Sequence, residues 1–224
     1  MRARMIGPRR QDERTLWLWW VLAHALYGAL GPAIVKILEG YFLAGSATRA
    51  SDGPTIVVGV TVVWLILGSL VQWWILRNHL AALRWWPVAT IVGAVIAEGV
   101  VFTVVTGNYT YRETFRSDVL IFGFTATAIG AAQWTVLRSR IPNAGWWVAT
   151  SAFGGALIWP AYTAVATSPI IGAVAARGVD QAAVVAVAAQ GAVSAAAYAL
   201  VTAFSLVGLL RQIKLRVPKR RVAV

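Results

Sequence analysis

One sequence unit recurs along the chain, and it restricts the fold more than any other feature. The segments Gln-Trp-Trp-Ile-Leu-Arg at 72–77 and Gln-Trp-Thr-Val-Leu-Arg at 133–138 stand 61 residues apart. After the same gap, each is followed by a tryptophan pair, at 85–86 and at 146–147. Internal repetition of this kind indicates a fold assembled from equivalent structural units.

Partial copies of the unit stand near both ends of the chain. We interpret Trp19-Trp20 and Leu210-Arg211 as its two outer halves. Each complete unit then begins at a tryptophan pair and ends at a Leu-Arg pair. The sequence predicts three such repeats, at about 16–77, 85–138 and 146–211.

Long apolar segments indicate that these units cross a membrane. Charged residues make up 12% of the 224 residues, about half of the roughly 25% typical of soluble domains. A spanning helix needs roughly 20 apolar residues, and lipid leaves no partner for free backbone groups. We therefore predict an all-α integral membrane domain over 16–210, with basic tails at 1–15 and 211–224. Its six spans are expected at about 16–38, 55–76, 85–106, 119–137, 146–167 and 183–210.

Lysine and arginine fall mainly on one side of these spans. The two tails and the loops 77–84 and 138–145 carry fifteen of them, and the opposite side carries four: Arg49, Arg112, Arg116 and Arg177. The positive-inside rule predicts cytoplasmic termini and a multi-pass protein of the cell (inner) membrane. The Arg- and Ala-rich, Cys-free composition suggests a bacterial chain. The net charge of +12 follows topology, so we expect anionic headgroups and no nucleic acid as its partners.

Tryptophan and arginine of the repeated unit recur at one predicted membrane depth. An indole prefers the headgroup level, and a terminal arginine meets anionic lipid and the negative end of the helix dipole. We interpret these residues as interface anchors, with ligand binding as the alternative. They are Trp19, Trp20, Trp85, Trp86, Trp146, Trp147, Arg77, Arg138 and Arg211.

Three units of equal orientation predict three parallel helical hairpins around an axis along the membrane normal. They would form a six-helix bundle. The segment 168–182 is expected to be either a short re-entrant piece or a helix on the outer surface. The last span, 183–210, is rich in alanine and glycine, which permits close backbone approach. It is predicted to be central in the bundle or to form an assembly face.

Glu98 is the most prominent intramembrane candidate. It follows Trp85 by thirteen residues, or about 20 Å of helix at about 1.5 Å per residue, and so lies in the outer half of the core. A carboxylate there is costly and usually faces a cavity or a partner. Two interpretations are open: a proton-titrating or cation-binding group, and a structural glutamate hydrogen-bonded to another helix.

His24 and three glutamines are the other intramembrane polar candidates. His24 shares a helix face with Gly28 and Gly31, an arrangement that would let it ligate the metal of a chlorophyll-type or heme macrocycle; a hydrogen bond to a neighbouring helix is the alternative. Polar side chains in a packed bundle bond across helices. We expect such symmetry-related contacts from Gln72 and Gln133, whereas Gln190 has no evident equivalent.

Several chemistries are excluded by composition. The chain has no cysteine and two histidines, which excludes disulfides, thiolate metal sites and histidine-rich metal sites. It contains no phosphate-binding Walker sequence, no His-Glu-x-x-His and no Gly-x-Ser-x-Gly. The sequence therefore predicts a protein that is not an enzyme, with no metal site and no required cofactor.

The segments 130–138 and 145–150 resemble a pattern in uncharacterised bacterial multi-pass membrane proteins. In that pattern a Gly/Ala-rich span ending in Gln-Trp-x-x-Leu-Arg precedes a Trp-Trp-x-x-Ala span. The resemblance covers about 60–165 and implies topology alone, with no activity.

Two functions fit these observations. The first is a non-enzymatic accessory or scaffold subunit that packs in the bilayer against itself or a larger complex, including a pigment- or quinone-bearing one. The second is a small-molecule transporter or substrate-capture component that uses Glu98.

Overall fold

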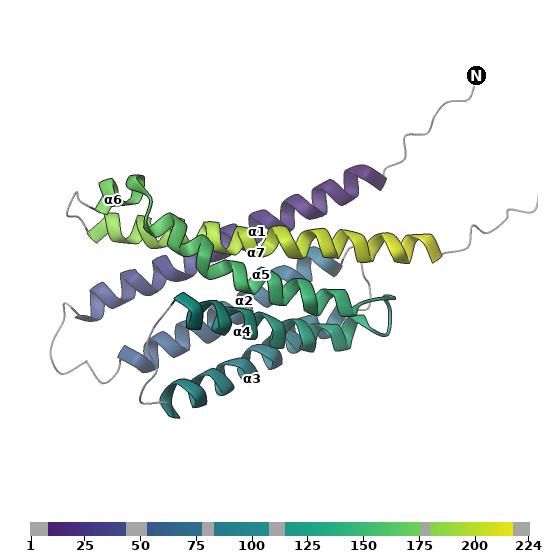
Figure 1. The fold of residues 1–224 in the computed structure, drawn as a ribbon, viewed down its shortest axis with the longest axis horizontal. Helices are drawn as coiled ribbons and strands as arrows, with labels where there is room; N and C mark the ends of the chain where they lie inside the picture. The colour runs from purple at the N-terminus through teal and green to yellow at the C-terminus, as the bar shows by residue number, and fades with distance from the viewer. Residues whose placement is uncertain (1–8, 44–52, 78–82, 108–114, 176–179, 217–224) are drawn as a thin grey trace, which may run out of the picture.

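The computed structural model describes residues 9–43, 53–77, 83–107, 115–175 and 180–216. Within these ranges the chain forms seven α-helices and a short 3-10 helix, with no strand, which confirms the all-α prediction (Figure 1). The elements are α1 (Arg9–Leu43), α2 (Gly53–Arg77), η2 (Leu83–Trp85), α3 (Trp86–Gly107), α4 (Phe115–Leu137), α5 (Gly145–Ala166), α6 (Pro169–Ala175) and α7 (Asp180–Arg216).

Five of the described helices are long and apolar enough to cross a membrane: α1, α3, α4, α5 and α7. The helix α2 covers the remaining predicted span, but the apolar stretch found in its described part, Val62–Arg77, is shorter. Internal prolines do not end their helices, because α1 continues past Pro32 and α5 past Pro160.

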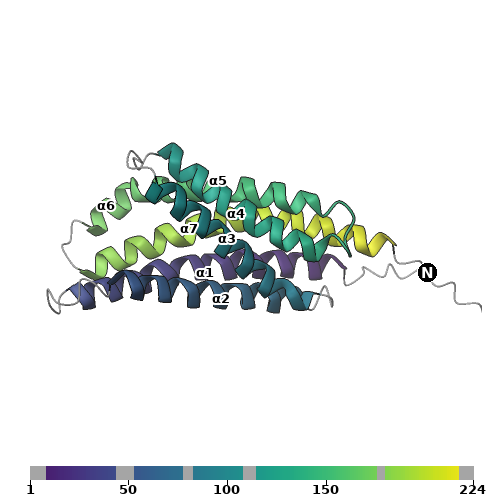
Figure 2. The ribbon, with the colours of Figure 1, turned by 90° about the horizontal axis from the view of Figure 1, so that it is seen from below.

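The six long helices pack as a closed ring. Each contacts two neighbours, in the order α1, α2, α3, α4, α5, α7 and back to α1 (Figures 1 and 2). Helices consecutive in the chain are thus adjacent in space, as expected for helical hairpins with short connections. The contacts of α2 are the least extensive, and α7 packs closely between α1 and α5.

Neighbouring helices alternate in direction, so the repeated tryptophans gather at one end of the bundle. The starts of α1, α3 and α5 and the ends of α2, α4 and α7 lie together there, on the right in Figure 1. We call this the tryptophan end. Its core combines the second tryptophan of each pair with leucines that close the repeats, Leu76, Leu137 and Leu210.

Glycine sets the closest helix contacts. A Cβ at Gly28 of α1 would collide with the carbonyl oxygen of Gly191 of α7, and one at Gly155 of α5 with Ala126 of α4. Both glycines stand eight residues after a buried tryptophan, where α3 has the buried Ala94. Small residues at one repeated position therefore let backbones approach where lipid supplies no hydrophobic drive for association.

The segment between α5 and α7 contains a separate short helix. Residues Pro169–Ala175 form α6, which packs against α7 at the end opposite the tryptophans (Figure 2). Part of the predicted segment 168–182 lies outside the described residues.

Candidate functional site: a buried tryptophan–glutamine cluster

The two tryptophans of each pair have opposite environments. Trp20, Trp86 and Trp147 are 0% exposed, whereas Trp19, Trp85 and Trp146 are 54%, 57% and 66% exposed. Successive residues of an α-helix point about 100° apart, so one ring faces outward and the next faces the core. The prediction that all six tryptophans are interface anchors is therefore wrong for Trp20, Trp86 and Trp147, which pack against other helices.

The three buried rings meet inside the ring of helices. The centroid of Trp147 lies 6.0 Å from that of Trp20 and 5.6 Å from that of Trp86, both in edge-to-face orientation. This arrangement places the positive edge of one indole against the negative face of another. Trp147 thus joins α1, α3 and α5.

Each buried indole donates a hydrogen bond to the second helix of another repeat. Trp86 Nε1 donates to Gln72 Oε1 at 3.1 Å, and Trp147 Nε1 donates to Gln133 Oε1 at 2.8 Å. Both pairs are separated by 14 residues and are equivalent by the 61-residue offset. Their recurrence satisfies a buried N–H in the same way twice.

The third copy of this bond uses a different acceptor. The position of Gln72 and Gln133, four residues before the closing leucine, is Leu206 in α7. Trp20 Nε1 donates instead to Thr202 Oγ1 at 3.0 Å, one turn earlier on α7. The three bonds run from α1 to α7, from α3 to α2 and from α5 to α4, around the whole bundle.

The two predicted glutamines also contact each other and connect the cluster. Gln133 Nε2 donates to Thr90 Oγ1 at 2.8 Å and lies 3.4 Å from Gln72 Oε1. The Gln72 amide nitrogen lies 3.0 Å from His24 Nε2, and His24 Nδ1 lies 2.8 Å from the Trp20 carbonyl. Because a carbonyl only accepts, Nδ1 carries the proton and Nε2 accepts from Gln72.

His24 does not fit the macrocycle interpretation. It is buried, and both of its ring nitrogens are engaged within the chain. The space beside its glycines is filled by protein, because Gly28 faces Gly191 and Gly31 faces the indole of Trp64. The alternative prediction, a histidine hydrogen-bonded to a neighbouring helix, agrees with this geometry.

Glu98 lies away from the cluster and outside the bundle interior. Its neighbour Ala97 is fully buried on α3, and Glu98 itself is exposed beside the exposed Ile96 and Phe102. The Glu98 side chain therefore does not face a cavity inside the bundle. A Cβ added at Gly99 would meet nothing within 4 Å, so no packing within the chain requires that glycine.

Gln190 is buried in α7 and is not part of the cluster that contains Gln72 and Gln133. Its Oε1 has no hydrogen-bond partner among the residues that the structure describes, and the same holds for Ser151 Oγ. Its backbone carbonyl accepts a bond from Ser194 Oγ at 2.6 Å. Neither group joins the hydrogen bonds around Gln72 and Gln133.

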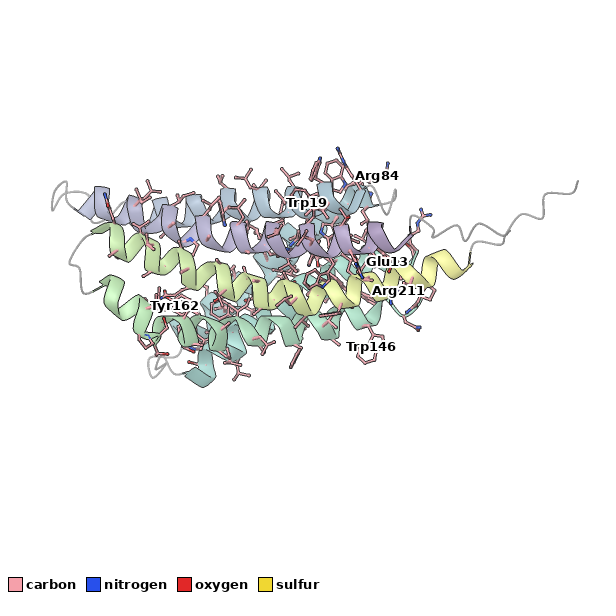
Figure 3. All side chains as sticks on the ribbon, turned by 90° about the horizontal axis from the view of Figure 1, so that it is seen from above. Glu13, Trp19, Arg84, Trp146, Tyr162 and Arg211 are labelled. Carbon is pink, nitrogen blue, oxygen red and sulfur yellow. The ribbon has the colours of Figure 1, made fainter. Side chains whose placement is uncertain are left out.

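The predicted arginine anchors are exposed at the tryptophan end. Arg77 and Arg138 lie over indole rings. Arg211 pairs with Glu13 of α1 at 2.9 Å, and Figure 3 labels these two residues side by side at this end. Their exposure agrees with the predicted position at the end of the bundle.

Comparisons of the chain with protein-family models, curated proteins and solved structures found no match. The cluster joins amides, indoles, a hydroxyl and a neutral imidazole, and in the described ranges no three acidic or histidine side chains gather as a possible metal site. Such a set positions helices.

Proposed function

We propose that the chain is a six-span, three-repeat membrane protein with both termini in the cytoplasm and the tryptophan end at the cytoplasmic boundary. Five long apolar helices and the sixth helix α2 support the span count. The fifteen-to-four distribution of Lys and Arg supports the orientation. Two equivalent tryptophan–glutamine bonds, and a third tryptophan bond to Thr202, link neighbouring helices around the ring and support the repeat arrangement.

Within that membrane, we infer a non-enzymatic accessory or scaffold subunit. The observation that carries this proposal is the contrast between the hydrogen-bonded cluster of indoles and amides and an exposed Glu98. Gln72, Gln133 and the three buried indoles are bonded within the chain, which favours a structural role for the cluster. A carboxylate on a lipid-facing helix costs a few kcal/mol or more, and a partner would reduce that cost.

The partner proposed for Glu98 is a transmembrane helix of another chain that brings a hydrogen-bond donor or a basic side chain to the same depth. Charge complementarity favours such a helix over lipid tails. Gly99 and Thr103 lie on the same exposed side of α3, one turn apart, and small residues at this spacing allow a second helix to approach closely.

Purification in mild detergent tests this proposal. We expect the wild-type chain to co-purify with a membrane partner, or with a second copy, and Glu98→Leu to lose it while remaining monodisperse. Glu98→Gln keeps hydrogen-bonding capacity and is expected to retain the partner. Val95→Leu, three residues before Glu98 on the same exposed face, is the control. Equal retention of the partner by wild type and by Glu98→Leu would contradict the proposal. An absorption spectrum of the purified complex detects any bound pigment or quinone.

The alternative, transport or substrate capture through Glu98, has a distinct prediction. It requires a water-filled cavity beside the carboxylate, and the outward position of Glu98 on α3 supplies no support for one. Loss of solute uptake in Glu98→Gln, with the partner still bound, would favour transport over the scaffold role.

A further inference from the structure

Two equivalent arginines at the tryptophan end lie on indole rings. The guanidinium carbon of Arg77 is 5.3 Å from the centroid of Trp73, and that of Arg138 is 5.1 Å from the centroid of Trp134. Each tryptophan precedes its arginine by four residues, and the two pairs are related by the 61-residue offset. Both indoles are partly buried and pack against the core, so they fix the position of the charge above them.

Neither arginine is neutralised by a described carboxylate. Within the part of the molecule that the structure describes, no carboxylate lies within ion-pair distance of Arg77 or Arg138, and both side chains are exposed. The charge of each guanidinium is therefore available to an outside anion.

The third repeat differs at this position. Arg211 is the equivalent arginine, but Val207 stands where the other repeats have tryptophan. Arg211 is instead held by Glu13, with its Nη2 at 2.9 Å and its Nε at 3.0 Å from one carboxylate oxygen (Figure 3). At this position two repeats thus present an arginine over an indole with no carboxylate partner among the described residues, and the third presents a paired one. Arg84 also lies over an indole, 5.6 Å from the centroid of Trp85, but it is outside this position and that ring is 57% exposed rather than packed against the core.

Stacking determines which part of the guanidinium remains free. A guanidinium placed over an indole can stack one face of its planar group on the ring and keep its in-plane N–H donors free. Those donors match two oxygens of a phosphate in bidentate geometry. At the depth proposed for the tryptophan end, the phosphates at hand are those of lipid headgroups.

We propose that the Trp73–Arg77 and Trp134–Arg138 pairs are two equivalent binding sites for the phosphodiester of an anionic phospholipid, and that Arg211 forms no third site because Glu13 occupies it. The proposal rests on the membrane orientation given above. It assigns a stoichiometry of two lipids per chain, which diffuse attraction to a charged surface does not predict.

Native mass spectrometry with phosphatidylglycerol as the probe tests this stoichiometry. We expect wild type to retain two molecules in excess of phosphatidylcholine, and Arg77→Gln and Arg138→Gln to retain one each. Binding at the altered site should be about 10- to 150-fold weaker, because a charge-assisted hydrogen bond contributes about 1.5–3 kcal/mol. Arg140→Gln and Arg211→Gln remove the same charge and are expected to retain two. Equal loss in all four variants would overturn the proposal in favour of diffuse electrostatics.

Two further measurements identify the ligand and separate loss of lipid binding from misfolding of a variant. Excess inorganic phosphate should leave the bound lipid in place, and its displacement would overturn the lipid assignment in favour of a free-phosphate site. Arg77→Lys keeps the charge without the planar fork and is expected to weaken the first site several-fold, as is Trp73→Leu. Unchanged lipid retention in both variants would contradict the stacked geometry.

A separate experiment distinguishes failure of the two lipid sites from failure of the proposed membrane embedding. Alkaline carbonate extraction tests membrane embedding without reference to lipid sites. Release of the chain by carbonate would refute the membrane proposal itself, whereas a carbonate-resistant chain that retains no phosphatidylglycerol would refute only the two sites.

Discussion

The tryptophan end and the outer face of α3 both place polar groups in apolar surroundings, but the polar groups are hydrogen-bonded in the first region and exposed in the second. At the tryptophan end, Gln72 and Gln133 bond to buried indoles and to each other. On α3, Glu98 is exposed among apolar side chains. The difference shows that a polar residue in such a helix is not by itself evidence of an internal site, because its direction decides which partner satisfies it.

The largest expected effect separates the two tryptophans of one pair. Trp147→Ala removes a buried ring and is expected to lower the free energy of unfolding by about 3–5 kcal/mol, as large-to-small core changes do. Trp146→Ala removes an exposed ring and is expected to cost far less. Thermal unfolding in detergent micelles measures both, and similar losses would contradict the opposite environments.

Replacing a glycine with a larger residue tests the same contrast between a buried and an exposed position. Gly28→Val places side-chain atoms against the backbone of Gly191, so we expect it to destabilise the fold by about 1–3 kcal/mol or more. Gly99→Val meets nothing within 4 Å and is expected to leave the isolated chain as stable as wild type. A larger loss of unfolding free energy for Gly99→Val than for Gly28→Val would contradict this prediction.

Removing one hydrogen-bond partner tests the pairing of indole and amide. Trp147→Phe and Gln133→Leu each leave a buried group unpaired, for which we expect losses of about 1–3 kcal/mol. Because the two side chains share a bond, a double-mutant cycle is expected to give a coupling of about 0.6–1.7 kcal/mol. Additive losses would show that the bond contributes nothing specific.

The smallest effect is expected on the outer face of α3. Glu98→Leu breaks no bond found among the described residues, so the unfolding free energy of the isolated chain should change by no more than about 0.5 kcal/mol. The matched interior change, Gln72→Leu, breaks bonds to Trp86 and His24 and should cost more. Equal costs would place Glu98 in a structural contact.

Helix positions could be predicted from the sequence, because spans in lipid must be long, apolar and helical. The inward or outward direction of a side chain could not. In water, a hydrophobic residue indicates the core, but a lipid-facing surface is as apolar as the interior, so Trp146 and Trp147 look alike. The direction of Glu98 was hidden for the same reason.

One feature of the cluster was readable in advance. The spacing of 14 residues from Gln72 to Trp86 recurs from Gln133 to Trp147, and an amide paired with an indole at a constant interval indicates a hydrogen bond. The bond from Trp20 to Thr202 could not be found in this way, because its partners are 182 residues apart and the acceptor lies one turn from the glutamine position.

The closure of the ring by α7 has a consequence for the order in which the protein is made. The acceptor for Trp20 and the glycine that faces Gly28 both belong to α7, so α1 lacks these partners until α7 has left the ribosome. A nascent chain stopped before residue 180 would hold five long helices in an open arc, and the surfaces of α1 and α5 that α7 covers in the closed ring would be left uncovered.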